Sequence, residues 1–261
     1  MIVDSHIHSM ASPDSTMPPE EIINNLKIKG FGCVFSEHIE FNELGEPFFC
    51  ADLDIYPSEY VKYKSDSVGL GFELSLMKEI IELNRQHAIN PSLDYVIGSI
   101  HWVDGFDMGA NAERTKEWFE SLGEEAYCRY LNDSLEMVET YDFFDSFGHI
   151  DYISRYSTLP EKNVFYERYA EQYDRLFKAL IERDKVMELC TRRLHDKIAQ
   201  QNLFNIYKRY HELGGCYVTL GSDAHVPDQL GVNFDIALEM INEIGLSPVY
   251  FKERKLVKSF L

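Results

Sequence analysis

Two histidines near the start of the sequence, His6 and His8, are separated by one residue and follow a short apolar run. In an extended strand the side chains of residues i and i+2 point to the same side, so both imidazoles can reach one metal ion. Taken alone, such a pair is better explained as two polar residues on the solvated face of a strand. The other histidines and carboxylates of the sequence therefore decide whether this pair does chemistry.

Further imidazoles and carboxylates stand in the same kind of place, at the ends of short apolar runs. They are His38, Glu73, His101, His149, Asp223 and His225. The remaining histidines, His87, His195 and His211, fall on or beside segments with helical periodicity, and we interpret them as ordinary surface or interface residues. Any single member of the first group is more simply a buried polar residue bonded to the main chain, but the recurrence of the pattern favours a shared site.

The apolar runs have the length of buried strands and alternate with segments of helical periodicity. Strands are predicted at residues 1–8, 32–38, 68–73, 95–101, 144–149, 186–190 and 216–225. Helices are predicted at residues 19–29, 74–87, 115–140, 164–183, 197–213 and 234–244. Alternating strands and helices form parallel sheets that can close into a barrel, with the chemistry at the C-terminal strand ends. Residues 40–64 lack clear periodicity and are predicted to form a long loop over the barrel mouth.

Length and composition favour one α/β domain over residues 1–261, because a chain of 261 residues with 45% hydrophobic residues can bury a large core. No apolar run approaches the roughly 20 residues that a spanning helix needs, and the sequence enters a strand without a leader segment. The five cysteines are widely spaced and form no Cys-x-x-Cys pair. We therefore expect a soluble cytoplasmic protein without membrane contact, disulfide framework or structural zinc knot.

The formal net charge of −19 would repel a polyanion, which makes nucleic acid a poor candidate partner. A small anionic substrate is still compatible with this charge, because bound divalent cations reverse the local sign. Mixed imidazole and carboxylate ligands suit Zn²⁺, Fe²⁺ or Mn²⁺. Roughly eight or nine such groups exceed the needs of one ion and predict two to three. A cluster of divalent ions is suited to the hydrolysis of phosphate esters.

Six motifs occur in one order along the chain. They are Asp-Ser-His-Ile-His at residues 4–8, Ser-Glu-His at 36–38, Gly-Phe-Glu at 71–73, Gly-Ser-Ile-His at 98–101, Gly-His-Ile-Asp at 148–151 and Gly-Ser-Asp-Ala-His at 221–225. This series resembles the polymerase and histidinol phosphatase (PHP) family, most of all its monofunctional histidinol-phosphate phosphatases. The resemblance implies a distorted (β/α)7 barrel with three metal ions at the C-terminal strand ends. It also implies hydrolysis of L-histidinol phosphate to L-histidinol and phosphate in histidine biosynthesis.

The resemblance further implies a metal ligand set, in which Glu73 bridges two ions. The first ion would be held by His6, His8, Glu73 and Asp223, the second by Glu73, His101 and His149, and the third by Asp14, His38 and His225. Glu73, Asp223 and His225 would act in catalysis through the metal cluster. An equally good explanation of Asp14 from the sequence alone is a turn or helix-capping residue. Glu37 is expected to support the ligands without binding metal.

One stretch departs from the family pattern. Residues 190–195 read Cys-Thr-Arg-Arg-Leu-His, where the subgroup commonly has an Asn-Thr-Ser/Ala-Gly-Leu-like stretch. The change places Arg192 and Arg193 near the predicted mouth, and with Arg155 they have the donors to hold a phosphate. We expect Arg155 and Arg192 to bind the substrate, although a solvated surface role explains any one of these arginines equally well.

Two other functions fit the same residues. The first is a related phosphoesterase that acts on a sugar, nucleotide or phosphotyrosine ester, and the second is a metal-binding module without catalysis. The retention of every ligand type weighs against the second. For histidinol phosphate, the cationic amine and imidazole would suit the acidic side chains of residues 40–54. The sequence does not indicate an oligomeric state.

Overall fold

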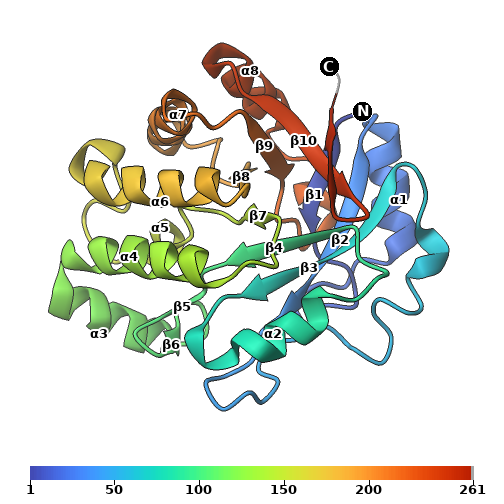
Figure 1. Ribbon diagram of the computed structural model, residues 1–261, viewed down its shortest axis with the longest axis horizontal. Helices are drawn as coiled ribbons and strands as arrows, with labels where there is room; N and C mark the ends of the chain where they lie inside the picture. The colour runs from blue at the N-terminus through green and yellow to red at the C-terminus, as the bar shows by residue number, and fades with distance from the viewer. Residues whose placement is uncertain (260–261) are drawn as a thin grey trace.

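The computed structural model describes residues 1–259 and centres on seven parallel strands (Figure 1). They are β1 (Val3–Ile7), β2 (Gly32–Ile39), β3 (Val68–Ser75), β4 (Tyr95–Ser99), β7 (Ser146–Phe147), β8 (Val186–Cys190) and β9 (Tyr217–Gly221). Each pairs in parallel with the next one along the chain. The sheet closes where His8 N donates to Ala224 O (3.0 Å) and Asp223 N donates to His6 O (2.8 Å). The predicted α/β fold with a distorted seven-stranded barrel is confirmed.

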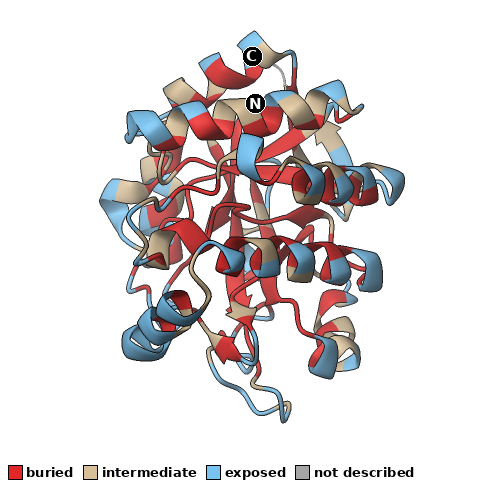
Figure 2. Cartoon of the chain, turned by 90° about the vertical axis from the view of Figure 1, so that its left-hand side faces the viewer, coloured by how far each residue is buried: buried red, intermediate tan, exposed pale blue. Residues whose placement is uncertain are grey.

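Helices form the outer layer of the barrel. They are α1 (Pro19–Ile28), α2 (Ile81–Ala88), α3 (Ala112–Leu122), α4 (Glu125–Thr140), α5 (Ile153–Tyr156), α6 (Ala170–Glu182), α7 (Lys197–Glu212) and α8 (Phe234–Ile244), with short 3-10 helices at Val61–Tyr63, Lys78–Ile80, Tyr166–Arg168 and Pro227–Gln229. Figure 2 shows these helices with exposed outer faces and buried inner faces around a buried sheet. Within residues 1–259 every helix is too short or too polar to cross a membrane.

Local sequence explains where the helices form. In α6, Tyr173, Leu176 and Leu180 recur at helical spacing and are all fully buried, so one apolar stripe faces the barrel. The helix α7 begins after Asp196, whose carboxylate accepts hydrogen bonds from the main-chain N–H groups of Ile198 (2.8 Å) and Ala199 (3.3 Å). Such N-caps satisfy donors that the first helical turn leaves unpaired.

Three predicted helix boundaries were wrong. Strand β3 continues to Ser75, which pairs with Ser99, so the helix expected from residue 74 starts only at Ile81 after a 3-10 turn. The helix predicted at 115–140 is two helices, α3 and α4, because Gly123 adopts a positive φ of 57° that ends the first one. The helix predicted from residue 164 begins as a 3-10 turn and becomes α6 at Ala170.

Two strand pairs were not predicted. A short hairpin of β5 (Trp102–Val103) and β6 (Phe106–Asp107) follows β4. Beyond the barrel, β10 (Ser247–Lys252) pairs in parallel with β9 and in an antiparallel way with β11 (Lys255–Lys258). The predicted loop at residues 40–64 holds only one β-bridge and one 3-10 turn, as expected, but its Tyr56 packs fully buried and donates to Gly71 O (2.7 Å).

Arg254, in the turn between β10 and β11, fastens this hairpin to the closed sheet. Its guanidinium pairs with Asp145 through Nε (2.6 Å) and Nη2 (3.1 Å) and also donates to the main-chain oxygens of Ala88 (2.7 Å) and Phe143 (2.6 Å). The side chain of Asp145 is only 10% exposed, so the ion pair is largely shielded from water. Removing the arginine would leave a buried carboxylate without its counter-charge.

We therefore predict that Arg254→Ala lowers the free energy of unfolding by about 2–4 kcal/mol, the range for lost hydrogen bonds to a buried charge. Urea denaturation followed by circular dichroism measures this change. Lys255→Ala, an exposed position in the same hairpin, should change stability by less than about 0.5 kcal/mol. Equal stability of the two variants would contradict the role given to Arg254.

Candidate metal centre

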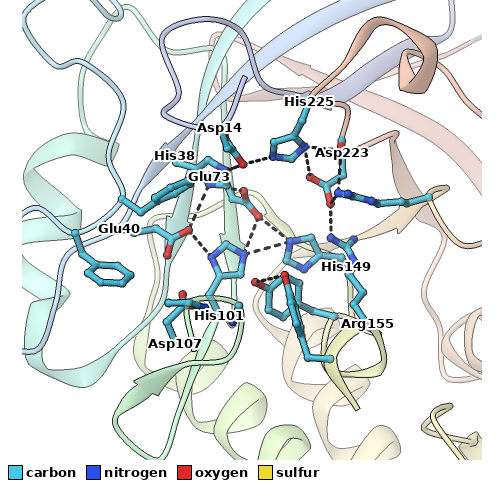
Figure 3. A pocket seen from close by; sticks show the side chains of 17 residues that line it. Asp14, His38, Glu40, Glu73, His101, Asp107, His149, Arg155, Asp223 and His225 are labelled. Carbon is cyan, nitrogen blue, oxygen red and sulfur yellow. Dashed lines mark hydrogen bonds and ion pairs between the residues drawn. The ribbon is translucent and has the colours of Figure 1, made fainter. Parts of the chain in front are cut away.

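The residues predicted to bind metal lie together at the C-terminal ends of the barrel strands, around one cavity of about 410 Å³ (Figure 3). Those that line the cavity are Asp14, His38, Glu73, His101, His149, Asp223 and His225. His6 and His8 are fully buried next to them. The cavity walls also include Glu40, Phe48, Phe49, Asp107, Gly109, Ala110, Tyr152, Arg155, Tyr156 and Arg192. The structure thus brings the residues predicted from the sequence together at one end of the barrel.

Strand pairing positions these side chains. In the register of β2 and β3, His38 is the direct partner of Glu73, so their side chains lie side by side. The closure of the barrel places Asp223 beside His6 through the main-chain hydrogen bond between them. Asp223 has a positive φ of 53°, and it begins the turn that brings His225 back over the strand ends. The site therefore depends on the closure between β1 and the segment after β9.

The side chains form three groups in which one atom from each residue lies within 4.8 Å of the others. The groups are His6 with His8 and Glu73, Glu73 with His101 and His149, and His8 with His38 and His225. Glu73 belongs to two groups, as a bridging carboxylate would. The third group contains His8, whose ring stacks on His38 (4.0 Å between centroids) and on His225 (4.3 Å).

Asp14 lies in the loop after β1 and reaches the third group. Its Oδ2 lies 2.7 Å from Nε2 of His225 and 3.5 Å from Nε2 of His38. The alternative role as a helix cap does not apply, because α1 begins at Pro19 without a side-chain cap. Glu37, fully buried, anchors this loop by accepting hydrogen bonds from Ser9 and from Oγ of Ser12 (2.5 Å). It therefore acts on the loop that carries Asp14.

Three histidines donate a hydrogen bond from Nδ1 to an oxygen atom. The acceptors are Oε1 of Glu188 for His6 (2.7 Å), Oε1 of Glu40 for His101 (2.7 Å) and the main-chain oxygen of Asp223 for His225 (2.9 Å). A carboxylate or carbonyl oxygen can only accept, so each Nδ1 carries the proton. In a neutral imidazole the other nitrogen, Nε2, then has a free lone pair. These lone pairs all point toward the centre of the cluster.

At the centre of the cluster, imidazole nitrogens face carboxylate oxygens, so lone pairs face lone pairs. Nε2 of His6 lies 3.2 Å from Oε2 of Glu73, and Nε2 of His8 lies 3.5 Å from the same oxygen. Within residues 1–259 these three buried atoms have no hydrogen-bond partner. Buried polar atoms without partners are costly, and facing lone pairs add repulsion. Divalent cations among these atoms remove both costs, and the mixed nitrogen and oxygen donors fit Zn²⁺, Fe²⁺ or Mn²⁺.

The negative potential of the cluster also changes protonation. Burial disfavours the charged form of His38, but the nearby carboxylates of Asp14 (3.5 Å) and Glu73 (3.1 Å) outweigh burial and raise its pKa to about 10. Burial likewise opposes charge on His6, and Glu188 and Glu73 raise its pKa well above the ordinary value. Without metal, His6 and His38 are therefore protonated, whereas burial and the neighbouring His38 and His225 lower the pKa of His8. Metal binding must displace these protons, which makes it weaker at low pH.

Two carboxylates that hold these histidines were not assigned this role by sequence reasoning. Glu40 was expected only as part of an acidic stretch that contacts the substrate, yet its Oε1 holds His101. Glu188 was not singled out because it lies inside an apolar run. Its signal is the alternation within β8, where Met187 and Leu189 face one side and the acid faces the other. A carboxylate on the inner face of a barrel strand needs a buried partner.

The three arginines near the predicted mouth divide into two roles. Arg155 and Arg192 line the cavity, and both contact Oδ2 of Asp223, at 2.5 Å and 3.3 Å. Arg193 instead pairs with Asp151 (2.8 Å) and donates to Oδ1 of Asn163 (2.8 Å), away from the cavity wall. The expectation that both adjacent arginines lie near the mouth is thus met by one of them.

The three histidines assigned to the surface stay outside the cavity lining. His87 lies in α2 and stacks on Phe41, with 5.5 Å between the ring centroids. His195 lies just before α7 and contacts the main-chain oxygen of Arg192, while His211 lies in α7 and contacts that of Gly215.

Residues 4–192 match the PHP domain family, and the chain belongs to that family. It is 39% identical over 254 residues to a probable histidinol-phosphatase of Clostridium acetobutylicum, with 97% of this chain and 98% of the relative covered. A probable histidinol-phosphatase of Thermotoga maritima is 24% identical over 260 residues, which cover 98% of each chain.

A solved structure extends the likeness to three dimensions. It is the crystal structure of histidinol phosphate phosphatase from Lactococcus lactis subsp. lactis Il1403 complexed with zinc, L-histidinol and phosphate. The two chains share 26% sequence identity and superimpose with a TM-score of 0.86, which covers 98% of this chain and 99% of that chain. The zinc, L-histidinol and phosphate are those of the Lactococcus protein.

Because Glu73 belongs to two of the three groups, its substitution should change the metal content of the protein more than the loss of a residue from one group. Glu73→Gln removes the charge that faces two groups of histidines, so it should release more metal per chain than His38→Ala, which alters only the third group. Elemental analysis of purified variants measures the difference, with circular dichroism to confirm folding. Equal or smaller loss in the Glu73 variant would show that this carboxylate does not bridge.

Proposed function

We propose that this protein is a metal-dependent phosphomonoesterase that hydrolyses L-histidinol phosphate to L-histidinol and phosphate. The observation that carries the proposal is a single cavity in which clustered imidazole lone pairs and carboxylates lie beside two arginines. Membership of the PHP family supports it, as do the relatives named histidinol-phosphatase and the Lactococcus structure with zinc, L-histidinol and phosphate.

Two to three divalent ions, Zn²⁺, Fe²⁺ or Mn²⁺, would be held by the predicted ligand set. Its members are His6, His8, Asp14, His38, Glu73, His101, His149, Asp223 and His225. When bound, such ions lower the pKa of water and neutralise phosphoryl oxygens. The protein's part is to aim the Nε2 atoms at the centre, which the acceptors on the Nδ1 atoms achieve by holding the proton of the neutral imidazole on Nδ1.

Arg155 and Arg192 are the proposed phosphate-binding residues. Both guanidinium groups reach the same carboxylate, Asp223, from the cavity wall. Arg155 also contacts Sγ of Cys190 (3.3 Å), and its side chain is only 14% exposed, which limits its freedom to move away. Planar N–H donors at this place bind phosphate oxygens and stabilise the charge that develops on them as the ester bond breaks.

Acidic and aromatic side chains form another end of the cavity, where Asp107 and Phe48 line the wall. Tyr152 also lines the cavity, but it stacks on His149 with 4.8 Å between the centroids and lies against the guanidinium of Arg155 at 5.3 Å. Burial raises the pKa of Asp107, so a nearby cation would be favourable to its charged form. We assign this end to the cationic amine and the imidazole of the substrate. Among the acids of residues 40–54, Glu40 is the member that lines the cavity.

The size of the cavity also suits this substrate class. A volume of about 410 Å³ holds a small phosphorylated molecule, and the net charge of −19 disfavours nucleic acid as a partner.

The central test is phosphate release from L-histidinol phosphate by the purified protein. Treatment with a chelator should abolish release, and Zn²⁺, Fe²⁺ or Mn²⁺ should restore it, because the residues of the cluster act through bound cations. Sugar, nucleotide and phosphotyrosine esters serve as comparison substrates. Full turnover in metal-free protein would overturn the metal dependence, and faster turnover of another ester would reassign the substrate.

If Asp107 recognises the cationic groups of the substrate, Asp107→Asn should impair the hydrolysis of cationic substrates selectively. The amide keeps an oxygen for the N–H groups of Gly109 and Ala110, which Oδ1 of Asp107 accepts at 2.7 Å in each case, but it loses the charge. The ratio kcat/KM for histidinol phosphate should fall about tenfold or more, which corresponds to roughly 1.4 kcal/mol. With 4-nitrophenyl phosphate, which has no cationic group, it should change little.

Arg155→Ala is the matched comparison, because loss of a phosphate contact should lower kcat/KM for both esters. A uniform effect of Asp107→Asn on the two substrates would remove Asp107 from substrate recognition.

A further inference from the structure

Glu188 lies on the inner side of the barrel in β8, directly beside the candidate metal centre, and is fully buried. Its Oε1 accepts from Nδ1 of His6 (2.7 Å), and its Oε2 accepts from the main-chain N–H of His149 (2.8 Å). His6 and His149 belong to different groups of the cluster, which have only Glu73 in common. The carboxylate of Glu188 therefore forms a hydrogen bond with one residue of each group.

Both oxygens of Glu188 face donors, and each has a distinct effect. The bond to His6 keeps the proton on Nδ1, so the lone pair on Nε2 faces Glu73. The hydrogen bond from the main-chain N–H of His149 fixes the position of this residue, which lies two residues after β7. A residue that offers only one acceptor oxygen can have one of these effects but not both at once.

Strand β9 leaves room for the contact between Glu188 and His6. Gly221, at the end of β9, packs so closely that a Cβ atom there would overlap with Oε1 of Glu188 and with Cβ of His6. Gly221 is not among the positive-φ glycines, so its backbone conformation does not itself require glycine. Space beside the Glu188 and His6 pair is what excludes a larger residue.

We propose that Glu188 is a positioning residue of the metal centre, which fixes the tautomer of His6 and the place of His149 at once. It is not among the residues that line the cavity, so it acts through these two histidines. The inference rests on the proposed metal centre, and the experiment below separates the failure of one from the failure of the other.

The isosteric variant Glu188→Gln tests the tautomer directly. An amide has one acceptor oxygen and one NH₂ group, so it cannot accept from both His6 and His149. If its oxygen accepts from the main chain of His149, its NH₂ group faces Nδ1 of His6 and moves the proton to Nε2. If it is turned round, two donors face each other at His149. Either arrangement weakens metal binding at one group.

The measurement is Zn²⁺ affinity, obtained by competition with a chromophoric chelator. Glu188→Gln should bind Zn²⁺ about 10- to 100-fold more weakly, as for other losses of a carboxylate behind a histidine ligand. The visible spectrum of Co²⁺-loaded protein should change in band position or intensity, because it reports the geometry of the ligands. Thermal unfolding of the metal-free variant monitors folding separately.

Asp145→Asn is the matched control, since it makes the same acid-to-amide change at a largely buried residue that pairs with Arg254. This variant should lower stability and leave Zn²⁺ affinity and the Co²⁺ spectrum unchanged. If Glu188→Gln does not fold, Glu188→Asp replaces it, because aspartate keeps the charge but is too short to reach both donors. The same loss of affinity is expected.

The outcomes separate the two ideas. If the unaltered protein binds no Zn²⁺ or Co²⁺, the metal centre itself is wrong. If it binds them and the Glu188 variant binds Zn²⁺ equally tightly with an unchanged Co²⁺ spectrum, the positioning role is wrong while the metal centre stands. A loss of affinity in Asp145→Asn equal to that in the Glu188 variant would also overturn the role, by assigning the effect to general destabilisation.

Discussion

The structure depends on one electrostatic constraint, the burial of many electron pairs in a small volume at one end of the barrel. Imidazole nitrogens of His6 and His8 face carboxylate oxygens of Glu73 and Asp223 at 3.2–3.8 Å, with no protein cation between them in residues 1–259 except the arginines at the edge. Such an arrangement is unfavourable without added positive charge. In the metal-free state protons supply part of it, as the raised pKa values of His6 and His38 indicate, but burial keeps the pKa of His8 low.

The barrel supports this constraint from below and from the side. Glu188 below the cluster and Glu40 in the cavity wall hold imidazole protons on the Nδ1 atoms, and Glu37 anchors the loop that carries Asp14. At the side, the two cavity arginines approach Asp223 from segments that follow β7 and β8. The result is a cavity with a basic edge, an electron-rich floor and an acidic aromatic wall. This distribution of charge complements a small molecule that has a dianion at one end and cations at the other.

Much of this could be predicted from the sequence, because buried parallel strands are short apolar runs and their ends mark the site. His38 and Glu73 came together for this reason. The remainder depends on contacts that no local pattern records. Glu188 is 182 residues from its partner His6, and Asp107 stands on a hairpin whose strands have two residues each. Arg192 and Arg193 are adjacent, yet the turn they occupy sends one to the cavity and the other to Asp151.

The closure of the barrel has a consequence for the order in which the protein acquires its site. Asp4 accepts hydrogen bonds from the main chain of Ser222 (2.9 Å) and Gly231 (2.9 Å), 218 and 227 residues further along. Contacts of such long range form late, because a large loop must close before they contribute. A nascent chain on the ribosome therefore carries His6 and His8 for most of its synthesis before Asp223 emerges. Until then these histidines are available to any free metal ion, and only completion of the last parallel strand of the barrel encloses them in the finished centre.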